Sequence, residues 1–309
     1  MSIALPLLSP HPHFLDIIAV HSGAGGRTQD SRLGPEALKK AGIVDWLKAL
    51  GLTVDWHDIG PSTGRASPEE SAIGHVADVC ARVSLRIHQS VSEGRRFLVL
   101  GGDHSCAIGT WSGAFNALGG RGAMGLLWVD AHMDSHVPET SPSGNVHGMP
   151  VAHLLGHGAV ELTALAKPGP AVRPGDIAIV GARSFEPEEP EFLDRHGVRV
   201  YHMDHVTARG TEAVIGEALE GITAETAAFG ISIDLDALDP ADAPGTGSAV
   251  ENGIRAAELA AAHGGMGRSD ARFLGLEIAE FNPILDKDGQ TVETVKLLVE
   301  SFFADTGGD

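Results

Sequence analysis

The sequence predicts a single three-layer αβα domain of the α/β class, with a mostly parallel sheet of about eight strands. Short apolar runs recur along the chain, separated by segments whose apolar residues follow a helical period. Most of these runs are apolar on both faces, as expected of parallel strands that helices cover on each side. This regular alternation favours one domain over residues 1–309, because no linker-like tract divides the chain.

The predicted elements follow from these patterns. In chain order the predicted strands are Asp16–Val20, Leu52–Asp55, Phe97–Leu100, Gly125–Val129, Asp176–Val180, Val198–His202, Ala227–Ile233 and Arg272–Ile278. Pro35 begins a predicted helix that runs to about Leu50, where Gly51 ends it. A second helix is predicted from a stripe spaced by threes and fours: Ile73, Val76, Cys80, Val83, Ile87 and Val91. A last helix is predicted over residues 291–303, with Val292, Val295, Leu298 and Phe302 facing inward.

Length and composition exclude several functional classes. The 309 residues are 43% hydrophobic, which is enough for a sizeable core. A formal net charge of −19 argues against binding to nucleic acid or to an anionic membrane surface, and it suits a cationic substrate. No apolar stretch reaches the ~18 residues of a membrane span. The start of the chain, residues 1–13, lacks the basic and apolar regions of a signal peptide, so a cytoplasmic protein is expected.

Three short motifs follow predicted strands and carry the side chains of greatest chemical interest. They read GGDHS at 101–105, DAHMD at 130–134 and SIDLD at 232–236. Extended backbone would project the alternating acidic and histidine residues of the last two motifs to one side. Two imidazoles and four carboxylates would then meet at the carboxyl ends of three strands, where open α/β sheets bind ligands. Burying this much negative charge without cations is costly, so the motifs predict two divalent metals that share bridging carboxylates.

Taken together, the motifs resemble those of the ureohydrolase family, which includes arginases, agmatinases and guanidinobutyrases. The resemblance covers residues 99–283. It implies two manganese ions per chain and a homo-oligomer, a trimer or hexamer. Mixed carboxylate and imidazole ligation suits manganese, and the ligand types alone leave iron, cobalt and nickel open. The implied ligands of one ion are His104, Asp130, Asp134 and Asp234, and those of the other are His132 and Asp236 with Asp130 and Asp234 bridging.

The resemblance also implies hydrolysis of a guanidinium group. Two metals would lower the pKa of a bridging water and supply a hydroxide to attack the guanidinium carbon. Asp134 would accept the proton of this nucleophile and pass it towards the departing amine. Glu280 matches the family glutamate that pairs with the guanidinium, and His147 would be the proton shuttle.

The loop SPSGNVHG at 141–148 looks like the arginase branch, whose loop holds the α-carboxylate of an amino acid through hydroxyl and amide groups. This implies that Ser141 and Ser143 contact that carboxylate, and Asn145 belongs to the same pattern. It makes L-arginine the first predicted substrate, with L-ornithine and urea as products. N-hydroxy-L-arginine and 4-guanidinobutyrate remain alternatives, as does a non-catalytic accessory subunit.

Two positions depart from the arginase pattern. His136 stands where arginases usually carry an asparagine that binds the α-carboxylate, and Glu186 stands where an aspartate is usual. Glu186 and Glu189 match acidic positions near the α-amino group. Three loops, at 135–147, after Val180 and at 240–253, are expected to form the walls of the substrate pocket.

Other histidine, cysteine and glycine patterns are interpreted as structural. His153 and His157 are spaced i, i+4 on a predicted helix, but no glutamate follows His153 as a metalloprotease motif requires. His202 and His205 lack a partner ligand pattern. The glycines at 23, 25 and 26 do not match a dinucleotide fingerprint. The cysteines at 80 and 106 are expected to be buried, reduced thiols.

Overall fold

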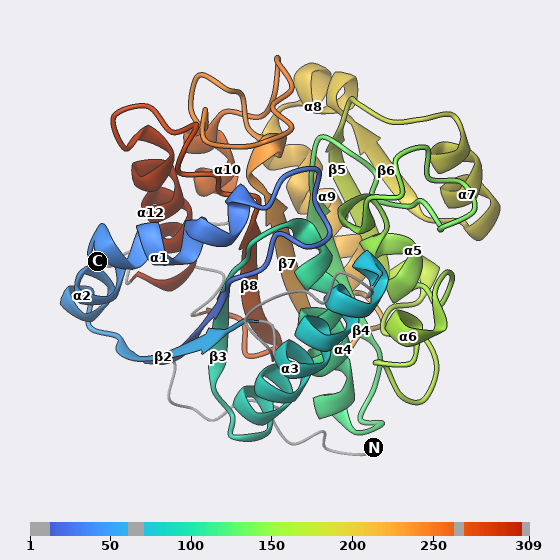
Figure 1. The fold of residues 1–309 in the computed structure, drawn as a ribbon, viewed down its shortest axis with the longest axis horizontal. Helices are drawn as coiled ribbons and strands as arrows, with labels where there is room; N and C mark the ends of the chain where they lie inside the picture. Colours follow the sequence, from blue (N-terminus) through green and yellow to red (C-terminus); the bar gives the residue numbers. More distant parts are fainter. Residues whose placement is uncertain (1–12, 61–70, 263–268, 305–309) are drawn as a thin grey trace.

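The computed structural model describes residues 13–60, 71–262 and 269–304 and has the predicted fold class. Eight strands form one sheet in the order β2-β1-β3-β8-β7-β4-β5-β6, and every neighbouring pair is parallel (Figure 1). The strands are β1 (Phe14–Val20), β2 (Thr53–Ile59), β3 (Arg96–Leu100), β4 (Met124–Val129), β5 (Ile177–Ala182), β6 (Arg199–His202), β7 (Ala228–Asp234) and β8 (Phe273–Ala279). All eight predicted strands are present, with ends that coincide or differ by up to four residues.

Helices cover both faces of this sheet. They are α1 (Gly34–Lys40), α2 (Ile43–Ala49), α3 (Ala72–Ser92), α4 (Ala107–Leu118), α5 (Pro150–Leu154), α6 (Val160–Thr163), α7 (Glu188–His196), α8 (Met203–Arg209), α9 (Thr211–Thr223), α10 (Ala256–Ala262) and α12 (Gln290–Phe303). The long second helix and the last helix match their predicted ranges. Ile73 and Val292, at the first turns of α3 and α12, are only half-buried.

The core is divided by the sheet into two layers, as the prediction of three layers requires. One apolar cluster joins one face of the strands to α1, α2, α8, α9, α10 and α12. The other joins the opposite face to α3, α4, α5 and α7. Strand residues alternate between the two: in β1, Leu15 and Ile17 belong to the first cluster, whereas Ile18 and Val20 belong to the second. Both faces of the sheet are therefore sealed, and its carboxyl edge is left to the connecting loops.

The predicted helix from Pro35 to Leu50 is wrong as a single element. It is divided into α1 and α2 at Ala41 and Gly42, and Gly42 has φ of +79°. Glycine adopts this left-handed conformation without the steric cost of a Cβ, so the chain turns there instead of continuing one helix.

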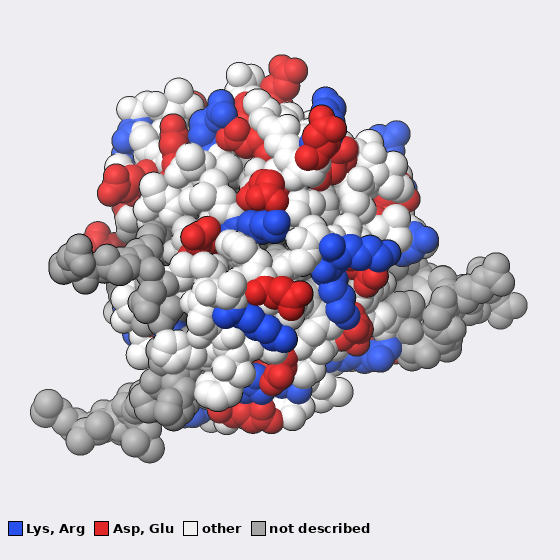
Figure 2. All heavy atoms as spheres, turned by 90° about the vertical axis from the view of Figure 1, so that its left-hand side faces the viewer, with Lys and Arg blue, Asp and Glu red and all other residues white. Residues whose placement is uncertain are grey.

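The predicted thiols are as expected: Cys80 and Cys106 are both buried and free. None of the helices in the described parts of the chain combines the length and the apolar character that a membrane span requires. The prediction about residues 1–13 falls almost entirely outside the described residues. On the face shown in Figure 2, Lys and Arg side chains stand among Asp and Glu, and neither sign forms a continuous area there.

Candidate metal centre and its pocket

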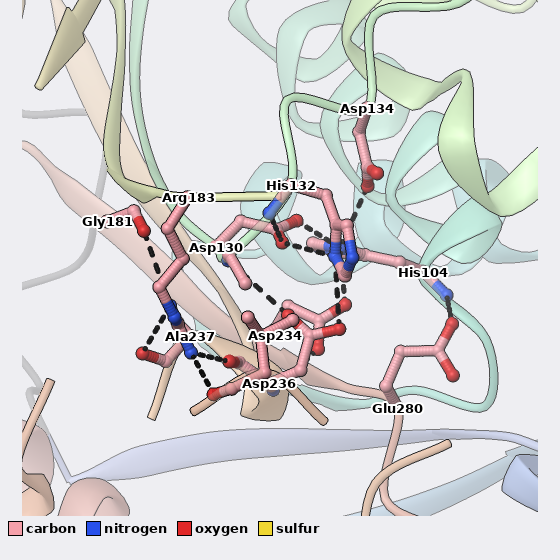
Figure 3. Close-up of polar contacts among 12 residues, drawn as sticks. His104, Asp130, His132, Asp134, Gly181, Arg183, Asp234, Asp236, Ala237 and Glu280 are labelled. Atoms are coloured by element: carbon pink, nitrogen blue, oxygen red, sulfur yellow. Dashed lines mark hydrogen bonds and ion pairs between the residues drawn. The ribbon is translucent and has the colours of Figure 1, made fainter. Parts of the chain in front are cut away.

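The three motifs meet at the carboxyl edge of the sheet, where adjacent strands end. β3, β8, β7 and β4 are consecutive in the sheet, so the segments that follow them lie side by side. Figure 3 shows the imidazoles of His104 and His132 pointing into one group of carboxylates from Asp130, Asp134 and Asp234. The predicted convergence of these side chains is confirmed.

Strand alternation is not the cause of this convergence, contrary to the sequence-based argument. β4 ends at Val129, and residues 130–134 form an irregular loop. The backbone N–H of His132 donates to Oδ1 of Asp130 at 2.7 Å, and Asp134 has φ of +50°. Short polar side chains commonly stabilise such turns. The loop therefore turns three alternate residues towards one point by its own hydrogen bonds.

The third motif is built in the same way. Asp234 is the last residue of β7, and Asp236 lies in a single 3-10 turn at Leu235–Ala237. Oδ1 of Asp234 caps that turn by accepting from the N–H of Asp236 at 2.8 Å. The turn brings both carboxylates to the same site although the strand has already ended.

His104 has the geometry of a metal ligand. Its Nδ1 lies 3.2 Å from a carboxylate oxygen of each of Asp130, Asp134 and Asp234. The ring is buried, yet Nδ1 and Oδ2 of Asp134 make no hydrogen bond of good geometry with the described residues. A buried polar nitrogen facing three carboxylates without a hydrogen bond is the arrangement that a cation would complete.

The second imidazole marks a neighbouring position. Nδ1 of His132 lies 3.2 Å from Oδ2 of Asp236 and 3.4 Å from Oδ1 of Asp130. Asp130 thus presents one oxygen to each histidine, as a bridging ligand between two cations would. Two ligand groups, one around each histidine, share Asp130. The residues fit a pair of metal ions.

The protonation of this cluster depends on burial and on charge balance. Burial and the neighbouring Asp130 raise the pKa of the Asp134 carboxyl to about 7 in the absence of metal. Burial and the charges of Asp236 and Asp130 raise the pKa of Asp234 as well. Burial opposes ionisation of Asp130 too, but the two imidazoles outweigh it and hold the pKa of Asp130 low. A bound cation would supply the positive charge that the two imidazoles supply to the carboxylates in its absence.

Three buried residues behind His104 were missed by the sequence analysis. Ser232 Oγ lies 2.9 Å from His104 Nε2 and donates to Oε1 of Glu277 at 2.9 Å. Trp128 stacks on the imidazole at 4.2 Å between ring centroids and donates from Nε1 to Oδ2 of Asp130 at 2.9 Å. Such partners orient metal ligands. Ser232 belongs to the third motif, so its position before the aspartates was a signal that could have been used.

Glu280 and His147 form one unit at the side of the cluster. Oε1 of Glu280 accepts from the backbone N–H of His104 at 2.9 Å and lies 3.1 Å from Nδ1 of His147. Burial alone would lower the pKa of His147, but the hydrogen bond and charge of Glu280 raise it to about 9. Both contacts use Oε1, so Oε2 remains for a ligand.

Asp103 is a further residue that the sequence analysis left without a role. It is buried and accepts from the N–H of Gly25 with Oδ2 and from the N–H of Ser105 with Oδ1, both at 3.0 Å. The loop at 101–105 also lies directly against Ser22, where a Cβ at Gly102 would be 1.7 Å from the carbonyl oxygen. Asp103 and Gly102 thus fix the loop that carries His104 to the first βα loop.

A pocket of about 150 Å³ opens beside this cluster of imidazoles and carboxylates. As predicted, all three loops contribute to its wall. The lining residues are His132, Asp134, His136, Ser141, Pro142, Ser143, Asn145, His147, Gly148, Glu186, Glu189, Asp234, Asp236 and Ser248. Ser248, from the loop at 240–253, was not singled out in the sequence.

The two serines that are predicted to bind a carboxylate can each donate a hydroxyl hydrogen to a ligand. Oγ of Ser141 accepts from the N–H of Gly144 at 3.0 Å, and Oγ of Ser143 accepts from the N–H of Asn145 at 3.2 Å. Because these turns use the oxygens as acceptors, each hydroxyl hydrogen is available to a ligand in the pocket.

Glu186 and Glu189 have different environments. Glu189 is buried, and its two oxygens accept from the backbone N–H groups of Ser135 and Glu186 at 3.2 and 3.0 Å. Glu186 is exposed, and its Oε2 lies 3.2 Å from Nε2 of His136. The predicted contact of Glu189 with an α-amino group remains a prediction, while its observed contacts join the loops after β4 and β5.

Arg183 holds the third wall of the pocket in place. Its guanidinium donates to the carbonyl oxygens of Asp236 at 2.7 Å, Val250 at 2.8 Å and Ala237 at 3.2 Å (Figure 3 shows the first and last). The arginine was noted in its loop from the sequence, but its role depends on carbonyl groups, which carry no sequence signal.

Three histidines that the sequence analysis interpreted as structural, His153, His157 and His202, contact backbone or aromatic groups. The prediction that His153 and His157 share a helix is wrong, because α5 ends at Leu154. His153 is buried with Nδ1 2.9 Å from the Met149 carbonyl oxygen, and His157 packs against His196. His202 packs against Phe185.

Comparison with known proteins gives consistent results. The arginase family model matches residues 16–304. An arginase of Bacillus caldovelox is 33% identical over 297 residues, which are 94% of this chain and 98% of that protein. An arginase of Bacillus subtilis is 35% identical over 294 residues, which are 93% and 96% of the two chains.

Solved structures agree with the sequence matches. The crystal structure of arginase from Bacillus subtilis has a TM-score of 0.85 at 34% identity, covering 96% of this chain and 99% of that one. Arginase from Bacillus caldovelox has a TM-score of 0.86 at 33% identity, with 96% and 98% covered. A hypothetical agmatinase from Burkholderia thailandensis has a TM-score of 0.72 at 19% identity, which shows a shared fold alone.

Proposed function

The chain belongs to the arginase family, and on that premise we propose that it hydrolyses L-arginine to L-ornithine and urea with the help of two manganese ions. The observation that carries the proposal is the convergence of His104 and His132 with four carboxylates beside a pocket. Divalent metals bound there would lower the pKa of water held between them.

Glu280 would orient the guanidinium. Its backbone has φ of +66°, and His104 N–H and His147 hold Oε1. The free Oε2 would accept from a guanidinium N–H, a charge-assisted contact with a planar cation. The residue therefore fixes the reacting carbon relative to the metal cluster.

Asp134 and His147 would move protons. The carboxylate of Asp134 faces the cluster 3.2 Å from Nδ1 of His104, where it would accept a proton from the attacking water and pass it on. Since Nδ1 of His147 is used by Glu280, Nε2 is the ring nitrogen that would deliver a proton towards the departing amine.

The pocket would bind the amino acid end of the substrate. Ser141, Ser143 and Asn145 supply hydroxyl and amide groups for a carboxylate, and His136 supplies a ring nitrogen. Glu186 and Glu189 supply negative charge for an ammonium group. These roles favour arginine over a guanidine without the α-carboxylate.

Urea release tests the substrate. The manganese-loaded protein would be assayed with L-arginine, agmatine, 4-guanidinobutyrate and N-hydroxy-L-arginine at equal concentrations. We expect the largest kcat/KM with L-arginine. A preference for another guanidine would overturn the assignment of the pocket, and no urea from any substrate would favour an accessory role.

Metal content tests the centre independently of turnover. We expect two manganese ions per chain by elemental analysis, and loss of metal and urea release in Asp130→Ala, because Asp130 contacts both imidazoles. Asp194→Ala, an exposed carboxylate on α7, is the matched control and should retain both. Two tightly bound metals in Asp130→Ala would contradict the assignment.

Assembly and location complete the proposal. By family membership we expect a homo-oligomer, a trimer or hexamer, that acts in the cytoplasm on a small cationic substrate. Light scattering of the purified chain measures the assembly, and a monomer at micromolar concentration would contradict it.

A further inference from the structure

Two carboxylates face one imidazole nitrogen in the pocket, outside the ligand groups around His104 and His132. Nε2 of His136 lies 3.2 Å from Oε2 of Glu186 and 3.7 Å from Oε2 of Glu189. The ligand atoms of these three residues all lie within 4.8 Å of one another, and all three residues line the pocket. Glu189 is beyond hydrogen-bond distance of the nitrogen, so a hydrogen bond accounts for only one of the two carboxylates.

The distances agree with the spacing of ligands around zinc. Zinc binds imidazole nitrogens and carboxylate oxygens at about 2.0–2.2 Å, usually in a tetrahedron. Bonds of this length place two ligands of a tetrahedron roughly 3.3–3.6 Å apart. The distances of 3.2 and 3.7 Å from Nε2 of His136 to the two carboxylates are close to this range. The cluster therefore supplies three ligands at nearly the required spacing and leaves a fourth position to water.

The imidazole is oriented for this role from its other side. Nδ1 of His136 lies 3.1 Å from Oγ1 of Thr140, and the hydroxyl of Thr140 donates to the Val137 carbonyl oxygen at 3.3 Å. Because that hydroxyl hydrogen is used, Oγ1 can accept from Nδ1, and Nε2 then presents a lone pair to the carboxylates. Metal-binding histidines are commonly oriented by a hydrogen bond of this kind. The side chain of His136 is 6% exposed, so the ring is also held by its surroundings.

The charges of the cluster also favour a cation. Burial raises the pKa of the Glu189 carboxyl, because loss of water penalises its ionised form. The nearby carboxylate of Glu186 acts on that pKa in the same direction. A divalent cation between the two carboxylates would balance both charges, and the Glu186 side chain, which is 53% exposed, leaves the position open to solvent.

We propose that His136, Glu186 and Glu189 form a third cation site that prefers zinc and that competes with the amino acid end of the substrate. Imidazole ligands suit zinc, and zinc binds a given site of nitrogen and oxygen ligands more tightly than manganese does. Competition follows because the same three residues are proposed to bind the carboxylate and ammonium groups of the substrate. The competition rests on the proposed function, whereas the cation site does not.

Zinc binding to the manganese-loaded protein tests the site without turnover. Zinc chloride would be titrated by calorimetry, and the metals bound after dialysis would be measured by elemental analysis. We expect one zinc per chain in addition to the manganese already bound. No bound zinc would overturn the third site. Zinc that binds only as an equal amount of manganese is lost would also overturn it, because that would mean exchange at the cluster around His104 and His132.

Substitution of the ligands should remove the zinc and leave the manganese. His136→Asn keeps a polar side chain but lacks the imidazole nitrogen, so we expect no zinc at this position. In Glu186→Gln we expect the zinc affinity to fall at least about tenfold, because even the loss of a group that only orients a ligand costs this much. Glu186 is exposed, so this variant should fold even if His136→Asn does not. His88→Asn, an exposed histidine of α3, is the matched control and should bind zinc as the unaltered protein does.

The orienting hydrogen bond has its own test. Thr140→Val removes the hydroxyl beside Nδ1 of His136 but none of the three ligands, so the zinc affinity should fall about tenfold. Unchanged zinc affinity in both His136→Asn and Glu186→Gln would contradict the site.

The outcomes separate this inference from the proposed function. With L-arginine as substrate, zinc should raise KM and leave kcat unchanged, and L-ornithine should raise the Kd of zinc. If no guanidine yields urea but zinc binding depends on His136 and Glu186, the cation site stands and the enzymatic assignment fails. If L-arginine is hydrolysed but zinc binds equally to the variants, the cation site is wrong. A fall in kcat at unchanged KM would place the zinc outside the amino acid end of the pocket and would overturn the competition.

Discussion

At the scale of single residues, the two groups closest to the proposed chemistry have unusual backbone. Asp134 and Glu280 are not glycine, yet they have φ of +50° and +66°. Such conformations cost energy and persist where surrounding contacts determine them. In Glu280 the compensation is visible, because its backbone N–H donates to the Gly102 carbonyl oxygen at 2.8 Å. The backbone strain and the ligand-facing side chains thus occur at the same positions.

The pair of His147 and Glu280 makes stability and protonation depend on pH. The pKa of His147 is about 9 in the folded chain, above its ordinary value, after Glu280 outweighs the opposing effect of burial. The stabilisation is therefore complete below about pH 6.5 and is lost as the pH rises through about 9, an effect of about 3 kcal/mol at most. NMR titration of the metal-free protein should give this pKa.

Removing the carboxylate should remove the shift. In Glu280→Gln we expect the pKa of His147 to fall towards its ordinary range, because burial is then opposed only by the charges of Asp103 and Asp134. Glu139→Gln, an exposed residue of the pocket loop, is the control. An unchanged pKa in Glu280→Gln would show that another group holds the proton.

At the scale of elements, the loops at the carboxyl edge are fixed to one another by side chains that hydrogen-bond to backbone groups. Arg183, after β5, donates to carbonyl oxygens of the turn after β7 and of the loop at 240–253. Glu189 at α7 accepts from the loop after β4. The candidate metal ligands lie mostly on irregular segments, and these contacts give those segments a defined shape.

Arg183 contributes several directed hydrogen bonds at this position as well as a positive charge. A lysine keeps the charge but cannot reproduce the planar fork, so in Arg183→Lys we expect a loss of about 2–3 kcal/mol of unfolding free energy. We also expect manganese affinity to fall about 10- to 100-fold, because Asp236 is no longer oriented. Urea unfolding and metal titration measure both.

The control for this change is Arg195→Lys on α7, whose exposed side chain lies 4.0 Å from the Glu191 carboxylate. It should alter neither quantity. Metal affinity equal to that of the unaltered protein in Arg183→Lys would mean that the turn after β7 holds its shape without the guanidinium.

At the scale of the whole molecule, the carboxyl and amino ends of the strands carry different groups of polar side chains. The carboxyl edge carries the candidate metal centre. Near the amino edge, Asp16 of β1 is fully buried and accepts from Arg86 at 2.9 Å and Ser90 at 2.6 Å, and it pairs with Arg95 at 2.9 Å. This ion-pair network ties α3 to the sheet on the side away from the pocket.

Because the Asp16 ion-pair network lies away from the pocket, we predict that disrupting it lowers the stability of the fold without changing catalysis. In Asp16→Asn two arginines lose their shared buried charge, so we expect about 3–5 kcal/mol of destabilisation with kcat and KM for the substrate unchanged. Asp45→Asn, exposed on α2, should change neither. A lower kcat in folded Asp16→Asn would show that the two edges are coupled.

Much of the fold was determined by local sequence. Each buried parallel strand is apolar on both faces, so its run of residues is visible without knowledge of its neighbours. The division between α1 and α2 was not, because a glycine within a helical pattern can continue the helix or end it, and only the conformation of Gly42 decides which occurs. Strand order could not be predicted from local sequence either, because it depends on which apolar surfaces pack together in the folded chain.

In the candidate site, too, some features follow from local sequence and others are visible only in the folded structure. The side chains around the cluster could be predicted from local sequence, because acidic and imidazole groups at strand ends form recognisable motifs, as in residues 130–134. Only the tertiary structure revealed how they converge, and that Asp103, Ser232 and Arg183 support them. Those supports act through backbone groups and through residues distant in sequence, and hydrogen bonds of that kind exist only once the chain has folded.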